Sequence, residues 1–200
     1  MATVDKNRAQ MAKPARIRPR LVMGHSTLAA RDVEALHRFY CDVLGFEVTN
    51  RGPVPDGMEI VFLSQDGGAH HQIAMVGGAS TPPADFVMVD HLAFRTRTLT
   101  DLRLIHANLV AAGIEGILKI DHGNSWSLYF KDPEGNGVEC YVDSPFHVAQ
   151  PNAGTFNLDA TDEQIEQATR RRIEGSPEFQ LMKDWQAGFT RLLDERPRTR

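Results

Sequence analysis

The sequence predicts an α+β protein made of two tandem β-α-β-β-β modules, which form a curled mixed sheet around a cleft and are followed by C-terminal helices. Three observations predict this class. A strand, a helix and three more strands follow one another twice in the same order. Segments rich in glycine and proline separate the expected strands. Matching landmarks recur at a nearly constant separation, 66 positions from His25 to His91 and 68 from Gly45 to Gly113 and from His71 to Glu139.

The first module spans about residues 21–76. A strand over 21–29 carries His25, and Asp32 then suits the N-cap of a helix that ends at Gly45. The apolar positions of this helix follow helical spacing, at Leu36, Phe39, Tyr40, Val43 and Leu44. Three further strands are expected over 46–49, 59–64 and 71–76.

The second module spans about residues 89–143, after a linker at 77–85. A strand over 89–96 carries His91, and either Thr98 or Thr100 caps a helix that ends at Gly113. The apolar side chains of this helix are Leu102, Ile105 and Leu109. Strands are expected over 116–120, 125–130 and 138–142.

Two further segments flank the paired-module catalytic domain at 21–143. Residues 1–20 are basic and are expected to be a flexible tail, and residues 144–200 are expected to be a helical extension. Thr161 and Gln164 form a possible capping box for a helix through Ile173, and Ser176 with Pro177 suits the start of a second helix. This second helix has an apolar stripe that must be covered by its own domain, by a second subunit or by the mouth of the cleft, at Phe179, Met182, Trp185, Phe189 and Leu192.

Composition limits the class of partner. The net charge is −4, and no long basic stripe occurs after the first twenty residues, which argues against binding to nucleic acid or to an anionic membrane. Residues 1–20 contain no apolar stretch long enough for a signal peptide or a membrane span. Cys41 and Cys140 do not form a disulfide framework, so both are expected to be reduced thiols in a cytoplasmic protein. A small metabolite is the expected ligand.

The run from His122 to Glu139 carries an imidazole, a phenol and a carboxylate around a D-P-E-G-N-G turn. Strand alternation places Val138, Cys140 and Val142 on a packing face, so Glu139 points into the cleft, and the same alternation directs His91 into it. Two histidines and one carboxylate with open positions beside them are typical of a non-haem Fe(II) site.

The span Ile120–Glu139, which reads I-D-H-x5-L-Y-x2-D-P-x-G-x3-E, resembles the signature of type I extradiol ring-cleavage dioxygenases. These enzymes belong to the vicinal oxygen chelate superfamily, which also contains glyoxalases and bleomycin resistance proteins, and the chain resembles its small single-domain type. The resemblance implies an enzyme of aromatic catabolism that inserts both atoms of O2 into a catechol, with cleavage beside the diol. It also implies metal ligation by His25, His91 and Glu139, with Fe(II) as the metal and Mn(II) as the other ion to consider.

The resemblance also implies roles in the substrate pocket. His71 matches the acid–base histidine, and the repeat spacing favours it over its neighbour His70. His122 and Tyr129 match the residues that line the pocket, and Asn124 is a candidate for orienting the ring of His122.

Two other functions fit the same sequence. The first is a metal-dependent lyase or isomerase of the superfamily, glyoxalase-like or epimerase-like, which polarises a substrate without O2. The second is a binding or resistance protein that sequesters a small aromatic molecule without turnover. In any of these cases a homo-oligomer formed through sheet edges or through the C-terminal helix is expected.

Overall fold

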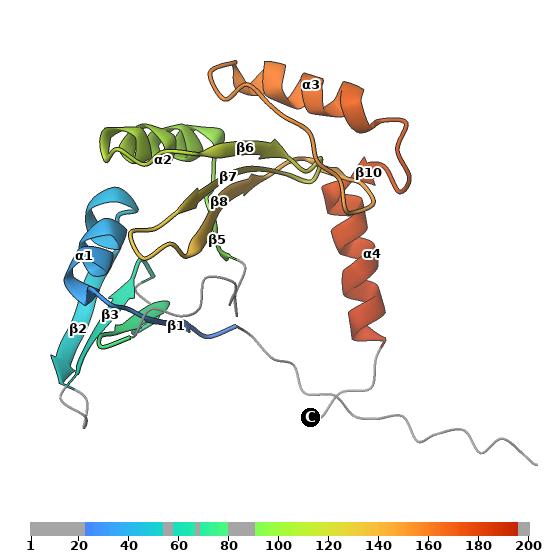
Figure 1. Cartoon of the computed structure of the whole chain (residues 1–200). Helices are drawn as coiled ribbons and strands as arrows, with labels where there is room; N and C mark the ends of the chain where they lie inside the picture. Colours follow the sequence, from blue (N-terminus) through green and yellow to red (C-terminus); the bar gives the residue numbers. More distant parts are fainter. Residues whose placement is uncertain (1–22, 54–57, 67–68, 80–90, 196–200) are drawn as a thin grey trace, which may run out of the picture.

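The computed structural model describes residues 23–53, 58–66, 69–79 and 91–195 (Figure 1). The expected basic tail and most of the linker between the modules lie outside these ranges. The described elements, in chain order, are β1 (Ser26–Ala29), α1 (Val33–Arg38), the π-helical turn η1 (Phe39–Val43), β2 (Glu47–Pro53), β3 (Glu59–Ser64), β4 (Ile73–Val76), β5 (Leu92–Arg95), α2 (Leu99–Ala111), β6 (Leu118–Asp121), β7 (Ser125–Lys131), β8 (Gly137–Asp143), β9 (Phe146–His147), α3 (Asp162–Ile173), β10 (Gln180–Leu181) and α4 (Met182–Asp194).

The two modules have the same sheet topology. The first sheet has the strand order β1-β4-β3-β2 and the second has the order β5-β8-β7-β6. In each sheet the first strand of the module runs parallel to the last, and the other pairs are antiparallel. The predicted α+β class and the tandem order are therefore confirmed. Each module contributes one four-stranded mixed sheet, and the described strands of the two sheets are not hydrogen-bonded to each other.

Local signals in the sequence place the first helix of each module. The Asp32 side chain accepts a hydrogen bond from the backbone N–H of Ala35 and caps α1. The helix then widens into η1 before the chain reverses at Gly45, which has a φ of +78°. Thr98, rather than Thr100, caps α2 and forms a reciprocal capping box with Asp101.

The modules pack against each other through aromatic side chains and a carboxylate. Phe39 contacts Phe130, and Phe46 contacts Phe94 with ring centroids 5.5 Å apart. Beside this cluster Glu134, in the β7–β8 turn, accepts hydrogen bonds from the backbone N–H groups of Arg31 and Asp32 at 3.0 and 2.7 Å. Apolar burial and these hydrogen bonds together join the second module to the start of α1.

The C-terminal extension covers one end of the second sheet. Figure 1 shows α2 and α3 over the same face of this sheet and α4 projecting from the β9–β10 pair. The Trp126 indole N–H donates to the Thr169 hydroxyl at 2.8 Å, which fixes α3 on β7. The capping box of Thr161 and Gln164 and the helix end at Ile173 are confirmed.

The predicted start of the last helix at Ser176 and Pro177 is wrong. Ser176 lies in a turn in which its N–H donates to the carbonyl of Ile173, and α4 begins only at Met182, after β10 has paired with β9. The strand pairing of Gln180 and Leu181 supplies tertiary hydrogen bonds that override the local helix signal. In the described part of the chain, no helix combines the length and apolar character that crossing a bilayer requires.

Candidate active site

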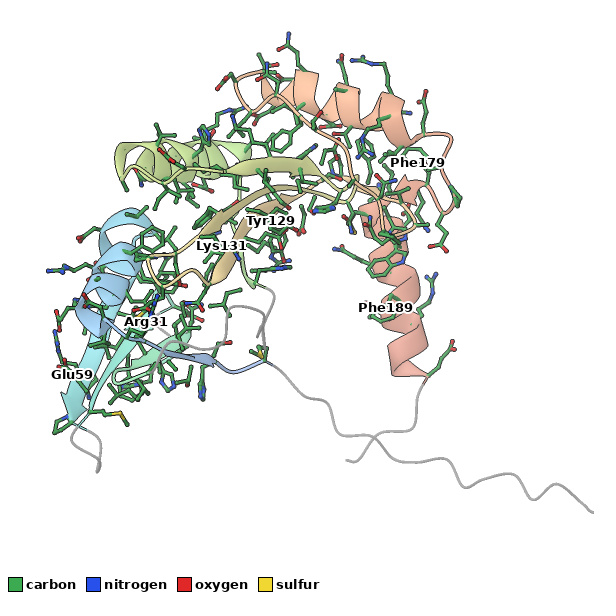
Figure 2. All side chains as sticks on the ribbon, in the orientation of Figure 1. Arg31, Glu59, Tyr129, Lys131, Phe179 and Phe189 are labelled. Atoms are coloured by element: carbon green, nitrogen blue, oxygen red, sulfur yellow. The ribbon has the colours of Figure 1, made fainter. Side chains whose placement is uncertain are left out.

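The site lies on the face of the second sheet opposite α2 and α3. Trp126, Leu128 and Phe130 of β7 are buried toward the helices, so the alternate residue Tyr129 points the other way, as Figure 2 shows. In the strand register Tyr129 pairs with Glu139 of β8, which in turn pairs with Ala93 of β5. The alternation expected from the sequence therefore brings these strands' functional side chains to one surface.

His91 and Glu139 form the central contact of this surface. The Nε2 atom of His91 lies 3.2 Å from Oε2 of Glu139, and their side chains are 33% and 11% exposed. A nearly buried carboxylate is costly unless a hydrogen-bond donor or a cation lies beside it. The imidazole supplies that neighbour, and it directs two donor atoms of metal-ligand type toward each other.

Tyr129 connects this pair to His122. Its ring meets the ring of His91 edge to face at a centroid distance of 5.4 Å. Its hydroxyl lies 3.0 Å from Nε2 of His122. Four of the expected residues therefore form a continuous row across the face of the second sheet, in the order Glu139, His91, Tyr129 and His122.

The ring of His122 is held by a backbone carbonyl. Its Nδ1 atom lies 2.8 Å from the carbonyl oxygen of Asn152, which can only accept, so Nδ1 carries a proton and donates. The partners of the two ring nitrogens of His122 are Asn152 and Tyr129, whereas the Asn124 side chain accepts from the Ser125 hydroxyl. Sequence patterns gave no signal for Asn152, since its contribution is a main-chain atom 30 positions downstream.

His25 and His71 come together in the first module. His71 lies two residues before β4, and its ring centroid is 4.3 Å from that of His25 and 4.9 Å from that of Phe62. Partial burial, with the neighbouring rings of His25 and His70, lowers the pKa of His71 below its ordinary value of 6.5. His70 is exposed, with its Nδ1 atom 3.0 Å from Nδ1 of His71.

The strand register does not support the repeat spacing that favoured His71 over His70 as the acid–base residue. Thr27 pairs with Ala74 in the first module just as Ala93 pairs with Glu139 in the second. The internal counterpart of Glu139 is therefore Ala74, and the spacing of 68 positions does not distinguish His71 from His70. The contact between His71 and His25 is the observation that separates the two neighbours.

The three expected ligands are thus divided, with His91 beside Glu139 and with His25 beside the acid–base candidate His71. Within the described ranges, no three His, Cys, Asp or Glu side chains converge closely enough to hold a metal ion. A cavity of about 270 Å³ adjoins the His91 side of the row, and its lining includes His91, Leu118, Tyr129 and Lys131. Such a cavity can take one small molecule beside the histidine and the tyrosine.

Comparison with known families identifies the class of protein. Residues 22–140 match the family model described as "Glyoxalase/Bleomycin resistance protein/Dioxygenase superfamily". Because the match covers more than half of the 200 residues, the chain belongs to this superfamily. The matched span covers almost all of both modules and ends one residue after Glu139, within β8.

Individual relatives are similar over the same part of the chain. The chain is 36% identical to biphenyl-2,3-diol 1,2-dioxygenase 3 of Rhodococcus globerulus, over 64% of this chain and 65% of that protein. It is 30% identical to catechol-2,3-dioxygenase of Bacillus subtilis, over 62% of this chain and 42% of that protein. The chain thus spans less than two thirds of the length of these curated relatives.

A solved structure agrees with the fold. The glyoxylase/bleomycin resistance protein/dioxygenase domain from Frankia sp. EAN1pec is similar with a TM-score of 0.53 and 23% identity, over 62% of this chain and 92% of that one. At this level of identity the likeness shows the fold alone.

Proposed function

We propose that the protein is an extradiol dioxygenase, which inserts both atoms of O2 into a catecholic substrate and opens the ring beside the diol. The observation that carries the proposal is the row Glu139, His91, Tyr129 and His122, which combines metal-ligand donors with proton-transfer groups on one face. The names of the relatives, a biphenyl-diol dioxygenase and a catechol dioxygenase, support the same substrate class.

The donor set favours Fe(II), with Mn(II) as the alternative. His91 and Glu139 already lie side by side, and His25 of the first module completes two imidazoles and one carboxylate in the proposal. Two imidazoles and one carboxylate at one ion would leave room there for a diol and for O2. The bound metal would supply the electronic coupling between the aromatic ring and O2 that the organic substrate lacks by itself.

The surrounding side chains handle protons and orientation. Since Nδ1 of His122 donates to Asn152, the neutral ring presents the lone pair of Nε2 to the Tyr129 hydroxyl. Tyr129 can then donate to His122 while its oxygen accepts from a substrate hydroxyl. The lowered pKa of His71 keeps its imidazole neutral at pH 7, and a neutral imidazole can take a proton and return it.

Oxygen uptake on a panel of diols tests this function. The protein is reconstituted with Fe(II) without air, mixed with catechol, 3-methylcatechol or 2,3-dihydroxybiphenyl, and then exposed to O2. We expect stoichiometric O2 consumption and a yellow ring-opened product. Absence of O2 consumption with every diol would contradict the proposal and favour the lyase, isomerase or binding function. Consumption of O2 without the yellow product would indicate a different oxidation.

Exposed apolar side chains support a homo-oligomer as part of the proposal. Trp185 stacks on His147, and Phe189 stacks on Trp185, yet Phe189 is 44% exposed and Leu181 is 41% exposed. A second copy would remove this surface of α4 from water. Sedimentation of the wild type and of Phe189→Ser tests this proposal. We expect the wild type to form an oligomer and Phe189→Ser to associate more weakly, and a monomeric wild type would exclude the homo-oligomer.

The cysteines fit a reducing compartment, and we propose the cytoplasm. Cys41 and Cys140 are free thiols. Burial, followed by the nearby charge of Glu139, raises the pKa of Cys140 to about 12, so this thiol is protonated and unreactive at neutral pH.

A further inference from the structure

An ion pair between Arg172 and the buried carboxylate of Asp121 links the C-terminal extension to the residue that precedes His122. Asp121 is 2% exposed, and its carboxylate accepts from the Thr169 hydroxyl at 2.8 Å and from the N–H of Gly123 at 2.7 Å. Nη2 of Arg172 lies 2.9 Å from Oδ1 of Asp121 and donates to the Asp121 carbonyl at 2.8 Å. Arg172 and Thr169 both belong to α3, which lies beyond the span matched by the superfamily model.

The same guanidinium group reaches the loop that holds His122. Nη1 of Arg172 donates to the side-chain Oδ1 of Asn152 at 2.5 Å. The carbonyl of Asn152 accepts from Nδ1 of His122, and the Gln150 side-chain amide donates to the carbonyl of His122 at 2.9 Å. A pair of backbone hydrogen bonds between Asp121 and Gly154, both 2.8 Å, fixes the far end of this loop.

We propose that Arg172 and Asn152 are positioning residues that hold His122 in the tautomer with its proton on Nδ1, so that Nε2 faces Tyr129 as a proton acceptor. The catalytic consequence rests on the proposed function, whereas the tautomer itself does not. A carbonyl oxygen cannot donate, so the placement of the Asn152 carbonyl decides which ring nitrogen carries the proton. Arg172 fixes that placement because it binds the Asn152 side chain and Asp121 at once.

This inference gives the C-terminal extension a part in the site. The family motif supplies His122 and Tyr129, but the contacts that orient His122 come from the 150–154 loop and α3. Removal of a residue that fixes the tautomer and orientation of a functional histidine typically lowers activity by about 10–100-fold.

Direct removal of Arg172 is a poor test by itself. It would leave the Asp121 carboxylate buried without its cation, which is strongly destabilising. Two milder variants keep the guanidinium group in the protein. Asn152→Ala removes the acceptor for Arg172 but keeps the carbonyl, and in Gly154→Ala the added Cβ would lie 2.8 Å from Nε of Arg172 and displace the guanidinium group.

The primary readout is the ¹⁵N NMR spectrum of histidine-labelled protein, in which the two ring nitrogens of His122 report the tautomer. We expect the Nδ1–H form in the wild type and a mixture of tautomers in Asn152→Ala and Gly154→Ala, with kcat/KM for the diol about 10-fold lower. Asn152→Asp, which keeps an acceptor for Arg172, is expected to retain the wild-type spectrum. Arg171→Ala, an exposed change on the same helix, serves as the control.

The outcomes separate this inference from the proposed function. A wild-type tautomer and wild-type kcat/KM in both Asn152→Ala and Gly154→Ala would overturn the positioning role. Failure of the wild type to consume O2 with any diol would overturn the dioxygenase function, and the NMR spectra would still decide whether Arg172 and Asn152 control His122.

Discussion

The imidazole of His91 and the carboxylate of Glu139 lie 3.2 Å apart, although 48 positions separate them in the sequence. The parallel pairing of β5 with β8 creates this proximity, since it sets Ala93 opposite Glu139 and leaves His91 at the entry of β5. The sheet therefore holds an imidazole and a carboxylate close together. A metal site requires a scaffold that fixes its ligands in this way.

Loss of the carboxylate charge is expected to abolish tight iron binding. Glu139→Gln keeps the shape of the side chain but replaces an anionic ligand with a neutral one. Changes to residues that only hydrogen-bond to a metal ligand typically lower metal affinity about 10–100-fold, and we expect a larger loss of Fe(II) affinity here. Asp143→Asn, at a half-exposed position on the same strand where Asp143 pairs with Arg95, is the matched control. Iron content after gel filtration measures the result, and full occupancy in Glu139→Gln would exclude Glu139 as a ligand.

His25 provides an independent test of the proposed ligand set. His25→Ala is expected to lose iron to a similar extent as His91→Ala, because each variant removes one neutral nitrogen donor. Metal titration of both variants under anaerobic conditions measures the affinities. Unchanged affinity in His25→Ala would show that the first module does not contribute this ligand.

His71 is expected to serve the reaction without holding the metal. His71→Ala should retain iron and lose turnover by about 10²–10⁴-fold, the range typical of a general acid or base. His70→Ala is the matched control, since His70 is exposed and its ring meets those of Phe62 and His71, whereas the ring of His71 also meets that of His25. Single-turnover O2 uptake measures both variants, and loss of turnover in His70→Ala alone would exchange the two assignments.

The contact between Tyr129 and His122 predicts a separate effect. Tyr129→Phe keeps the ring that meets His91 but removes the hydroxyl that lies 3.0 Å from His122. We expect kcat to fall by about 10²-fold, the lower end of the range for a positioned proton-transfer group, with iron content unchanged. Steady-state kinetics with the best diol of the panel measures this, and an unaltered kcat would remove Tyr129 from the proton path.

Period and capping patterns predicted much of the fold. The caps Asp32, Thr98 and Thr161 depend on contacts within a few residues, which a sequence records directly. The bounds of β3 follow from an apolar run that lies between turn-forming residues. The start of α4 depends instead on the pairing of β10 with β9, a contact across more than thirty positions. No local pattern at Ser176 contains that information.

The candidate site divides in the same way. Strand alternation was sufficient to direct Glu139 and His91 toward one surface, because side-chain direction follows from position in a strand. The partner of His122 could not be found in this way. The Asn152 carbonyl belongs to a loop whose place is set by Arg172 and by the Asp121–Gly154 bridge, and a backbone atom is common to every residue type.

Glu134 is expected to stabilise the junction of the modules in a pH-dependent manner. Burial alone would raise its pKa, but the N–H of Asp32 and the N–H and guanidinium of Arg31 outweigh burial, so the pKa lies below the ordinary value of 4.5. An acid whose pKa is lower in the folded state stabilises the fold above its unfolded pKa, and this contribution is lost as the pH falls through the folded pKa. Glu134→Gln should therefore lower the free energy of unfolding at pH 7 by about 1–3 kcal/mol. Urea unfolding at pH 7 and near pH 3.5 measures the difference, which should shrink at the lower pH. Glu166→Gln, an exposed change on α3, is the control, and an equal loss at both pH values in Glu134→Gln would mean that the charge of Glu134 does not join the modules.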